Sequence, residues 1–335
     1  MDIVTQAVLG SALAQSIAKK TQLRLAAWVG LLAGILADAD VLIFSDTDPL
    51  LTLEYHRHFT HSVFFIPFGA FVAAALCWLV IKKWSARDDI NFRQVYLFSL
   101  AGYSLSGFID ACTSYGTYLF WPVYDQRISF NIISIVDPVF SSILIVFVVF
   151  AWRKKQPRLA HIGLVLSALY LCIGLMQNYR AEQQIKNLLQ ERQHQAEKIL
   201  VKPSFANIFL WRLIYIADNN VYIDAVHLGF SAKLYPGASM PLFKMENEYP
   251  DLNSTTALYR DIKRFAHFSD GFIARGPLDN RVLGDMRYSM LPNSAQPIWG
   301  ITLNPDAPQK HAAYNFYRKN TAEMRQQFKQ MLLGK

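Results

Sequence analysis

The chain has 335 residues, of which 53% are hydrophobic and 17% charged, and its formal net charge is +8. A soluble protein carries more charge, and a bundle of membrane helices alone would exceed its mean hydropathy of +0.17. The composition therefore excludes a purely soluble enzyme and predicts a membrane part joined to a more polar part. Cys77, Cys112 and Cys172 all fall in apolar stretches, which indicates buried free thiols rather than a disulfide framework or a zinc knuckle.

Apolar stretches long enough to cross a membrane are concentrated before residue 180. A bilayer core needs about 20 apolar residues per helix. We expect about five membrane helices, over residues 23–44, 63–81, 95–113, 132–152 and 159–178. The first twenty residues are also apolar, but Asp2 stands where a signal peptide needs a basic start. They predict a short helix packed into the bundle or lying at its edge.

The basic residues predict the orientation of these helices. If the turn around residues 19–24 is cytoplasmic, it and the loops 82–94 and 153–158 carry three, four and four Lys or Arg residues, eleven in all. The opposite loops, 45–62 and 114–131, carry two, Arg57 and Arg127. Basic residues are retained on the cytoplasmic side, so everything after residue 179 is expected outside the cytoplasm.

The rest of the chain predicts a polar connecting helix over 181–200 and an outer α+β domain over 201–335. Two β-rich runs, 209–217 and 221–230, flank Asp218-Asn219-Asn220, which suits a hairpin turn. Short strands are expected to about residue 304, followed by a closing amphipathic helix over 311–333. The predicted fold class is thus an α-helical integral membrane bundle, residues 1–180, with a C-terminal non-cytoplasmic α+β domain.

Acidic and histidine residues gather at the outer ends of the expected spans. Charged groups in a membrane segment are costly, so they normally face a bundle interior and serve a function. Carboxylate and imidazole donors from separate segments suit a divalent cation, zinc first and manganese as the alternative. The candidate ligands or catalytic groups at this depth are Asp38, Asp40, His56, His61, Asp110 and Asp137.

Each candidate also has a structural interpretation. Asp38 and Asp40 are about 200° apart on a helix, so both face one metal only if the helix ends there. Asp110 can be satisfied by backbone groups or by Ser114, and Asp137 can cap the helix that Pro138 begins. Arg57 can bind a phosphate-like oxyanion or pair with a neighbouring aspartate, and with Arg127 it is a candidate for substrate binding.

Five ordered strings carry a resemblance to a known family: LAGILADADVLI, HRHFTHS, DACTSYGT, FWPVYDQR and SIVDPVF. The chain resembles the YdjM-like inner-membrane proteins, inferred metal-dependent hydrolases grouped with the zinc phospholipase C and single-strand nuclease superfamily. The resemblance covers roughly residues 1–180, and LGDMRYSMLP extends it more weakly into the outer domain. It implies that Asp38 or Asp40, His56, His61, Asp110 and Asp137 form the metal and catalytic set.

Two positions depart from that family pattern. Some members have Thr-His near the N-terminus, where this chain has Thr5-Gln6, so one imidazole ligand is missing. The family often has Gly where this chain has His58, which either compensates for the missing ligand or is neutral. The resemblance therefore supports a metal site more firmly than it supports a reaction.

The predicted function is metal-dependent hydrolysis of a phosphoester or lipid-linked substrate at the outer face of the inner membrane. A bound metal acidifies its water, and Asp40 or Asp137 is expected to act as general base. The alternatives are an ion-coupled transporter and a non-enzymatic scaffold with a structural Asp/His cluster. Nucleic acid is not an expected partner, because the basic residues match membrane topology.

The orientation gives the first testable prediction. A reporter that is active only outside the cytoplasm, fused after Lys335, should give signal, because the basic loops hold the other face inside. A reporter active only in the cytoplasm should stay silent at the same position. The reverse pattern would contradict the expected placement of the motif loops.

Overall fold

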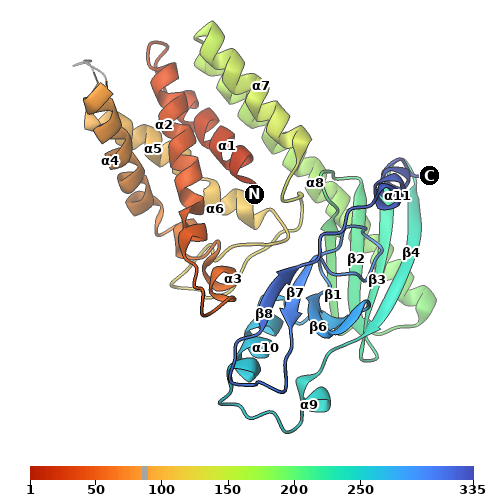
Figure 1. The fold of residues 1–335 in the computed structure, drawn as a ribbon. Coiled ribbons are helices and arrows are strands. Elements are labelled where there is room, and N and C mark those ends of the chain that lie inside the picture. Colours follow the sequence, from red (N-terminus) through yellow and green to blue (C-terminus); the bar gives the residue numbers. More distant parts are fainter. Residues whose placement is uncertain (85–89) are drawn as a thin grey trace. The chain divides into compact units, whose positions relative to one another are not determined.

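The computed structural model describes residues 1–84 and 90–335, so Arg87 of an expected cytoplasmic loop lies outside the described residues. The chain forms two compact units (Figure 1). Unit 1 comprises Met1–Leu42, Tyr55–Leu175 and Phe205–Asn207, and unit 2 comprises Ile43–Glu54, Met176–Ser204 and Ile208–Lys335.

Unit 1 is helical. Its elements are α1 (Ile3–Ser16), α2 (Leu23–Leu36), the 3-10 turns η1 (Ala37–Leu42) and η2 (Phe59–His61), α4 (Ile66–Trp84), α5 (Phe92–Tyr103), α6 (Ser106–Ala111), α7 (Pro138–Lys154) and the first part of α8 (Pro157–Arg192). Helices α1, α2, α4 and α5 pack side by side (Figure 1). Small residues such as Ala33, Ala70 and Ala73 fill much of their shared core, which allows the helix backbones to approach closely.

Among residues 1–84 and 90–335, three helices are long and apolar enough to cross a membrane: Leu23–Leu42, Ile66–Lys83 and Pro157–Arg192. The predicted number of five is not supported. The stretch 95–113 is divided between α5 and α6, because the chain leaves the helical path at Ser104 and Leu105. The stretch 132–152 yields α7, which begins only at Pro138 and whose 17 residues span about 25 Å, less than a typical bilayer core.

Unit 2 contains two four-stranded antiparallel sheets. The first has the order β1 (Lys198–Pro203), β2 (Leu210–Ala217), β3 (Asn220–Leu228) and β4 (Ala232–Pro241). The second has the order β5 (Ile273–Gly276), β6 (Asp279–Asp285), β7 (Trp299–Thr302) and β8 (Ala313–Phe316). The helices of this unit are α9 (Met245–Glu248), α10 (Ala257–Phe268), α11 (Ala322–Leu332) and the second part of α8, while α3 (Leu51–Tyr55) lies at its border with unit 1.

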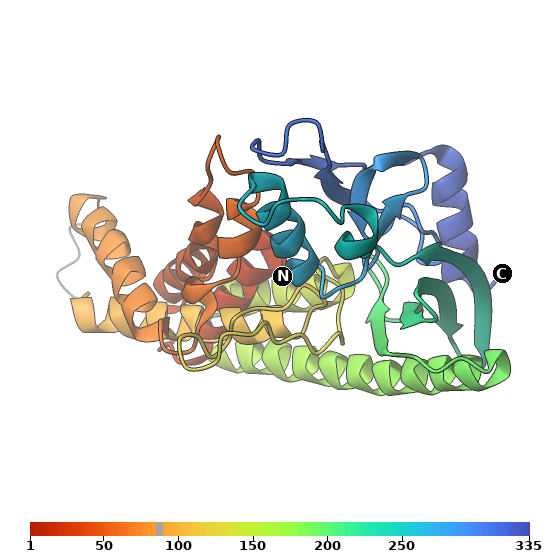
Figure 2. The same cartoon turned by 90° about the horizontal axis from the view of Figure 1, so that it is seen from below.

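The second part of α8 covers one face of the first sheet, along which it runs in Figure 2. Its inward residues Ala181, Ile185 and Leu188 recur every three or four positions and pack against Trp211 and Tyr215 of β2. Every residue of β2 is buried, because α8 covers one face and residues of the second sheet region, including Phe272 and Met286, cover the other. This two-sided burial explains why β2 is apolar at every position except Arg212.

One prediction for this part, the hairpin, is confirmed and others need correction. The β2–β3 hairpin is present, and Asp218 and Asn219 adopt the positive φ angles of 48° and 58° that a tight hairpin turn requires. The polar continuation of α8 ends at Arg192, earlier than expected, because β1 begins at Lys198. The expected closing helix over 311–333 is β8 followed by the shorter α11, and α10 was not predicted.

The segment Ile43–Glu54 leaves unit 1 and packs within unit 2. Arg264 of α10 holds it, with guanidinium nitrogens 3.0 Å from Asp48 Oδ1 and 2.8 Å from Glu54 Oε2. Leu50 of the segment is completely buried. One arginine thus fixes both ends of a seven-residue stretch, Asp48 to Glu54, between the two sequence motifs that carry the acidic and histidine residues.

The close packing of α1, α2 and α5 gives a second prediction. A Cβ atom at Gly30 would overlap the carbonyl oxygen of Gly10 on α1. Gly102 of α5 lies against the backbone of Gly30. Changing Gly30→Val should therefore lower the free energy of unfolding by about 1–3 kcal/mol through overpacking. Thermal unfolding in detergent measures the effect, and Leu32→Ala on the exposed side of α2 is the control. Equal stability of both variants would contradict this packing argument.

Candidate functional site

The first acidic pair lies where α2 changes its geometry. The α-helix ends at Leu36, and Ala37–Leu42 continues as a 3-10 helix. Asp38 and Asp40 can share a site only if the α-helix ends near them, and the structure has such an end. The two carboxylates reach different nitrogens of the same imidazole ring, that of His61.

Asp40 organises the segment that carries the histidines. Its Oδ2 accepts hydrogen bonds from the backbone N–H of Arg57 at 2.7 Å and from the hydroxyl of Thr60 at 2.7 Å. Its Oδ1 lies 3.2 Å from Nδ1 of His56. Arg57 adopts a positive φ of 60°, which turns its backbone N–H toward this carboxylate. One buried aspartate therefore fixes the path of residues 56–60.

Asp110 reaches the same place from α6. The close approach of α6 to η2 requires Gly107, because a Cβ atom there would overlap the carbonyl oxygen of His61. Asp110 lies one turn further along and is completely buried. The break after α5, which shortens the expected third span, is thus also what sets α6 against the histidine segment.

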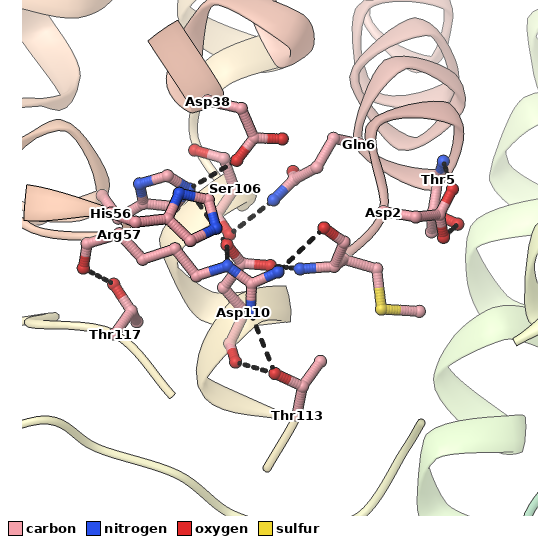
Figure 3. Close-up of polar contacts among 12 residues, drawn as sticks. Asp2, Thr5, Gln6, Asp38, His56, Arg57, Ser106, Asp110, Thr113 and Thr117 are labelled. Atoms are coloured by element: carbon pink, nitrogen blue, oxygen red, sulfur yellow. Dashed lines mark hydrogen bonds and ion pairs between the residues drawn. The ribbon is translucent and has the colours of Figure 1, made fainter. Parts of the chain in front are cut away.

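His61 lies between three carboxylates. Its Nε2 is 3.2 Å from Asp38 Oδ1 and 3.0 Å from Asp110 Oδ2, and its Nδ1 is 3.3 Å from Asp40 Oδ2. Figure 3 shows Asp38, Arg57 and Asp110 turned toward one another from three separate segments. The convergence predicted from the sequence is therefore present for these residues, and their roles as ligands stay predictions.

The two ring nitrogens of His61 have different surroundings, which decides the favoured tautomer. A neutral imidazole carries one N–H. If Nδ1–H donates to Thr60 Oγ1 at 3.0 Å, with Asp40 Oδ2 at 3.3 Å beside it, the lone pair of Nε2 faces two carboxylate oxygens, an arrangement that is repulsive unless a cation or proton lies between them. An imidazole held by a carboxylate on one nitrogen, with the other nitrogen directed at further ligands, is the usual arrangement at protein metal sites.

Asp110 has fewer hydrogen bonds than a buried carboxylate requires. Among the described residues, neither of its oxygens receives a hydrogen bond of good geometry, although Arg57 Nε lies 3.0 Å from Oδ2 and the α-amino group of Met1 contacts Oδ1. Arg57 supplies one positive side-chain charge against three carboxylates. Negative side-chain charge therefore remains in excess when the imidazoles are neutral, which favours a bound cation.

The donor set fits a metal ion. One ligand atom each from Asp38, His61 and Asp110 lie within 4.8 Å of one another. Ligand atoms ~2.0–2.2 Å from a tetrahedral zinc ion are about 3.3–3.6 Å apart. The two distances from His61 Nε2, 3.2 and 3.0 Å, are close to that range. Three protein ligands leave a fourth position for water or substrate, as catalytic zinc sites require.

His56 stands beside this group rather than in it. Its Nδ1 contacts Asp40, its ring packs at 5.5 Å from that of Tyr115, and its side chain is 28% exposed. Burial lowers the pKa of His56, against the hydrogen bond with Asp40, which raises it. The neutral ring that results can accept a proton.

The structure gives Asp137 a different place from the one expected. Its carboxylate accepts hydrogen bonds from the backbone N–H groups of Val139 and Phe140 and from the hydroxyl of Tyr170. None of these partners belongs to the Asp/His group, so within the described residues Asp137 caps α7, the alternative that Pro138 suggested. Nothing in this geometry presents it as a general base.

The two arginines of the outer loops are also engaged. Arg57 is 3% exposed and donates to Thr113 Oγ1 and to the carbonyl oxygen of Met1, so it pairs with the neighbouring aspartate rather than reaching outward. Arg127 donates to the carbonyl oxygen of His56 at 2.9 Å and lies over the ring of Tyr115. The contacts of Arg57 and Arg127 thus help to fix the histidine segment in place.

The two departures from the family pattern have different surroundings. Gln6, at the position of the missing imidazole, is buried, and its side chain donates to the carbonyl oxygen of Ser106 (Figure 3). His58 packs among aromatic rings, 4.5 Å from Tyr118 and 5.4 Å from Trp121. Sequence reasoning also missed Thr60 and Gly107, although Thr60 lies inside the HRHFTHS motif.

A second group of possible ligands lies in unit 2. Atoms of Asp48, Asp261 and His311 are within 4.8 Å of one another. Arg264 already contacts both carboxylates, at 3.0 Å from Asp48 and 3.4 Å from Asp261. Arg264 offsets part of the negative charge of this group, and its contacts hold the segment Ile43–Glu54.

The apolar helices and the buried Asp/His group define a membrane protein with a candidate metal site in its helical unit. The model of the YdjM inner membrane protein family matches residues 1–181, more than half of the chain. The chain therefore belongs to that family. No curated protein and no solved structure matches it significantly.

The pairing of Arg57 with Asp110 gives the third prediction. Arg57→Met removes the side-chain cation that faces a fully buried carboxylate, and we expect the free energy of unfolding to fall by about 3–5 kcal/mol. Adding Asp110→Asn should restore much of the loss, because a buried amide costs less than a buried carboxylate. Thermal unfolding in detergent measures both, and a double variant as unstable as Arg57→Met would contradict the pairing.

Proposed function

We propose that this protein is a membrane-bound metal-dependent hydrolase. The observation that carries the proposal is the position of His61, whose Nε2 faces Asp38 and Asp110 at 3.2 and 3.0 Å while Nδ1 faces Asp40. Two carboxylates around one imidazole lone pair are stable when a cation lies between them. The metal ligands are then Asp38, His61 and Asp110.

Zinc is the proposed metal, with manganese as the alternative, because two carboxylates and one imidazole suit either. When bound, such an ion acidifies a water molecule and polarises a phosphoryl oxygen. The relation to the zinc phospholipase C and nuclease superfamily is part of this proposal. It receives support from the mixed carboxylate and imidazole donors.

The other residues of the site have distinct proposed roles. Asp40 holds the Nδ1 side of His61 and so directs Nε2 toward the ligands. His56 accepts the proton of the attacking water, because its ring is favoured in the neutral form and its side chain is partly exposed. Arg57 holds Asp110 in position through its Nε, 3.0 Å from Oδ2. Asp40 is fully engaged, so we assign the general base to His56 instead.

The proposed substrate is a phosphoester or a lipid-linked molecule that reaches the site from the membrane. Membership of an inner membrane family supports access from the lipid phase. We propose that the site and the C-terminal domain lie on the non-cytoplasmic side, which the distribution of basic residues supports. Arg127, partly exposed beside His56, is the proposed contact for a phosphate oxygen.

Metal analysis of matched variants gives the fourth prediction. Wild-type protein purified in detergent should retain zinc or manganese, and Asp110→Asn should lose most of it, because the amide lacks the charge that balances the ion. Asp137→Asn is the control, since it makes the same change in a buried carboxylate that caps α7. Hydrolysis of a chromogenic phosphodiester should fall with metal content in the first variant only.

Two outcomes would contradict the proposal. Wild-type protein without bound metal, even after incubation with zinc or manganese, would leave a structural Asp/His cluster. Full function in a well-inserted Asp110→Asn protein would favour a scaffold or a partner-binding role. In that case the amide should also be neutral or stabilising, because it costs less to bury than a carboxylate.

A further inference from the structure

Helix α8 changes its surroundings within one turn. From Ile162 to Met176 its exposed side chains are apolar, with Ile173, Leu175 and Met176 between 44% and 58% exposed. Tyr179 follows at 62% exposed, and the next exposed side chain is that of Glu182. An apolar exposed surface that ends in a tyrosine and then becomes polar is typical of a helix leaving the bilayer core.

The turn between β3 and β4 is attached to α8 at this level. Gln177, which is 2% exposed, donates from Nε2 to the carbonyl oxygen of Leu228 at 2.8 Å. Arg180 donates to the carbonyl oxygen of Gly229 at 2.8 Å and to Gln177 Oε1 at 2.7 Å. Because Leu228 and Gly229 are the residues where the turn begins, their hydrogen bonds fix its height along the helix.

The tip of this turn presents aromatic surface to its surroundings. Phe230 is fully exposed, although such a side chain loses free energy by staying in water. Phe209, about half exposed, lies opposite Leu228, two residues before Phe230 in the chain, since the N–H of Leu228 donates to the carbonyl oxygen of Phe209 at 2.7 Å. Two phenylalanines therefore occupy the end of the sheet that is tied to α8 where its apolar surface ends.

We propose that the β3–β4 turn is a membrane contact: Phe230, with Phe209 beside it, inserts into the headgroup region of the bilayer that α8 crosses. The occupant of this surface is lipid because the hydrogen bonds to Gln177 and Arg180 hold the turn at the interface. Aromatic side chains at that depth bury apolar area while the neighbouring backbone remains hydrated. This inference is independent of the proposed hydrolase activity.

The test places a fluorescent reporter beside Phe230 without replacing it. In a Cys172→Ser background, Ser231→Cys is labelled with an environment-sensitive dye, and the whole protein is inserted into phosphatidylcholine nanodiscs that contain headgroup spin-labelled lipid. Gln195→Cys is the matched control, because it is exposed and follows the far end of α8. The fifteen residues from Gln177 to Arg192 separate the two labels by about 22 Å along the helix.

We expect the label at residue 231 to emit at shorter wavelength than the label at 195 and to be quenched by the spin-labelled lipid. Adding Phe230→Ser should reduce both effects toward the control values, and Phe230→Trp should preserve them. A label at 231 that behaves as the label at 195 would overturn the proposal and favour a protein partner for this surface. Unchanged quenching in the Phe230→Ser protein would overturn the role of Phe230 as the inserting residue.

Discussion

The helical unit is organised around one electrostatic constraint, the burial of three carboxylates beside a single imidazole. A buried carboxylate is stable only with a cation, a proton or several hydrogen-bond donors close to it. Asp40 obtains donors from the backbone and from Thr60. Asp110 contacts Arg57 and the α-amino group of Met1, but among the described residues it receives no hydrogen bond of good geometry. Asp40 therefore holds the structure of the site, whereas Asp110 can still accept a ligand.

The convergence of Asp38, Asp40 and Asp110 on the histidine segment was predictable from the sequence, whereas the position of Asp137 and the contacts that each residue makes were not. Carboxylates near the ends of apolar stretches are costly, so their shared depth already grouped Asp38, Asp40 and Asp110 with the HRHFTHS motif. Which nitrogen of His61 each carboxylate faces depends on the 3-10 geometry of η1 and on the approach of α6 at Gly107. Neither feature can be recognised from the local sequence before the packing is known.

The same limit applies to the number of spans. A hydropathy profile measures apolar character over a window of residues. It does not show where a helix must end to place a side chain in the site. The chain leaves the helix after α5, at Ser104 and Leu105, and α7 starts at Asp137-Pro138, a capping signal that was visible in the sequence. The β2–β3 hairpin was predictable for the opposite reason, because Asp218-Asn219 specifies its turn locally. Helix α10 has a local N-cap, Thr256, but lies among short strands, which obscured its pattern.

Helix α8 shows how one continuous element satisfies two environments. In its first part the exposed side chains, such as Ile173 and Leu175, are apolar, whereas in its second part the apolar residues Ile185 and Leu188 are buried under the first sheet. Mean hydropathy falls between the two parts because the exposed surface becomes polar, while the helix itself does not end. Gln177, the residue at the transition, donates a hydrogen bond from its side-chain amide to the carbonyl oxygen of Leu228. A polar group that would be costly in lipid is thus satisfied by the strand end.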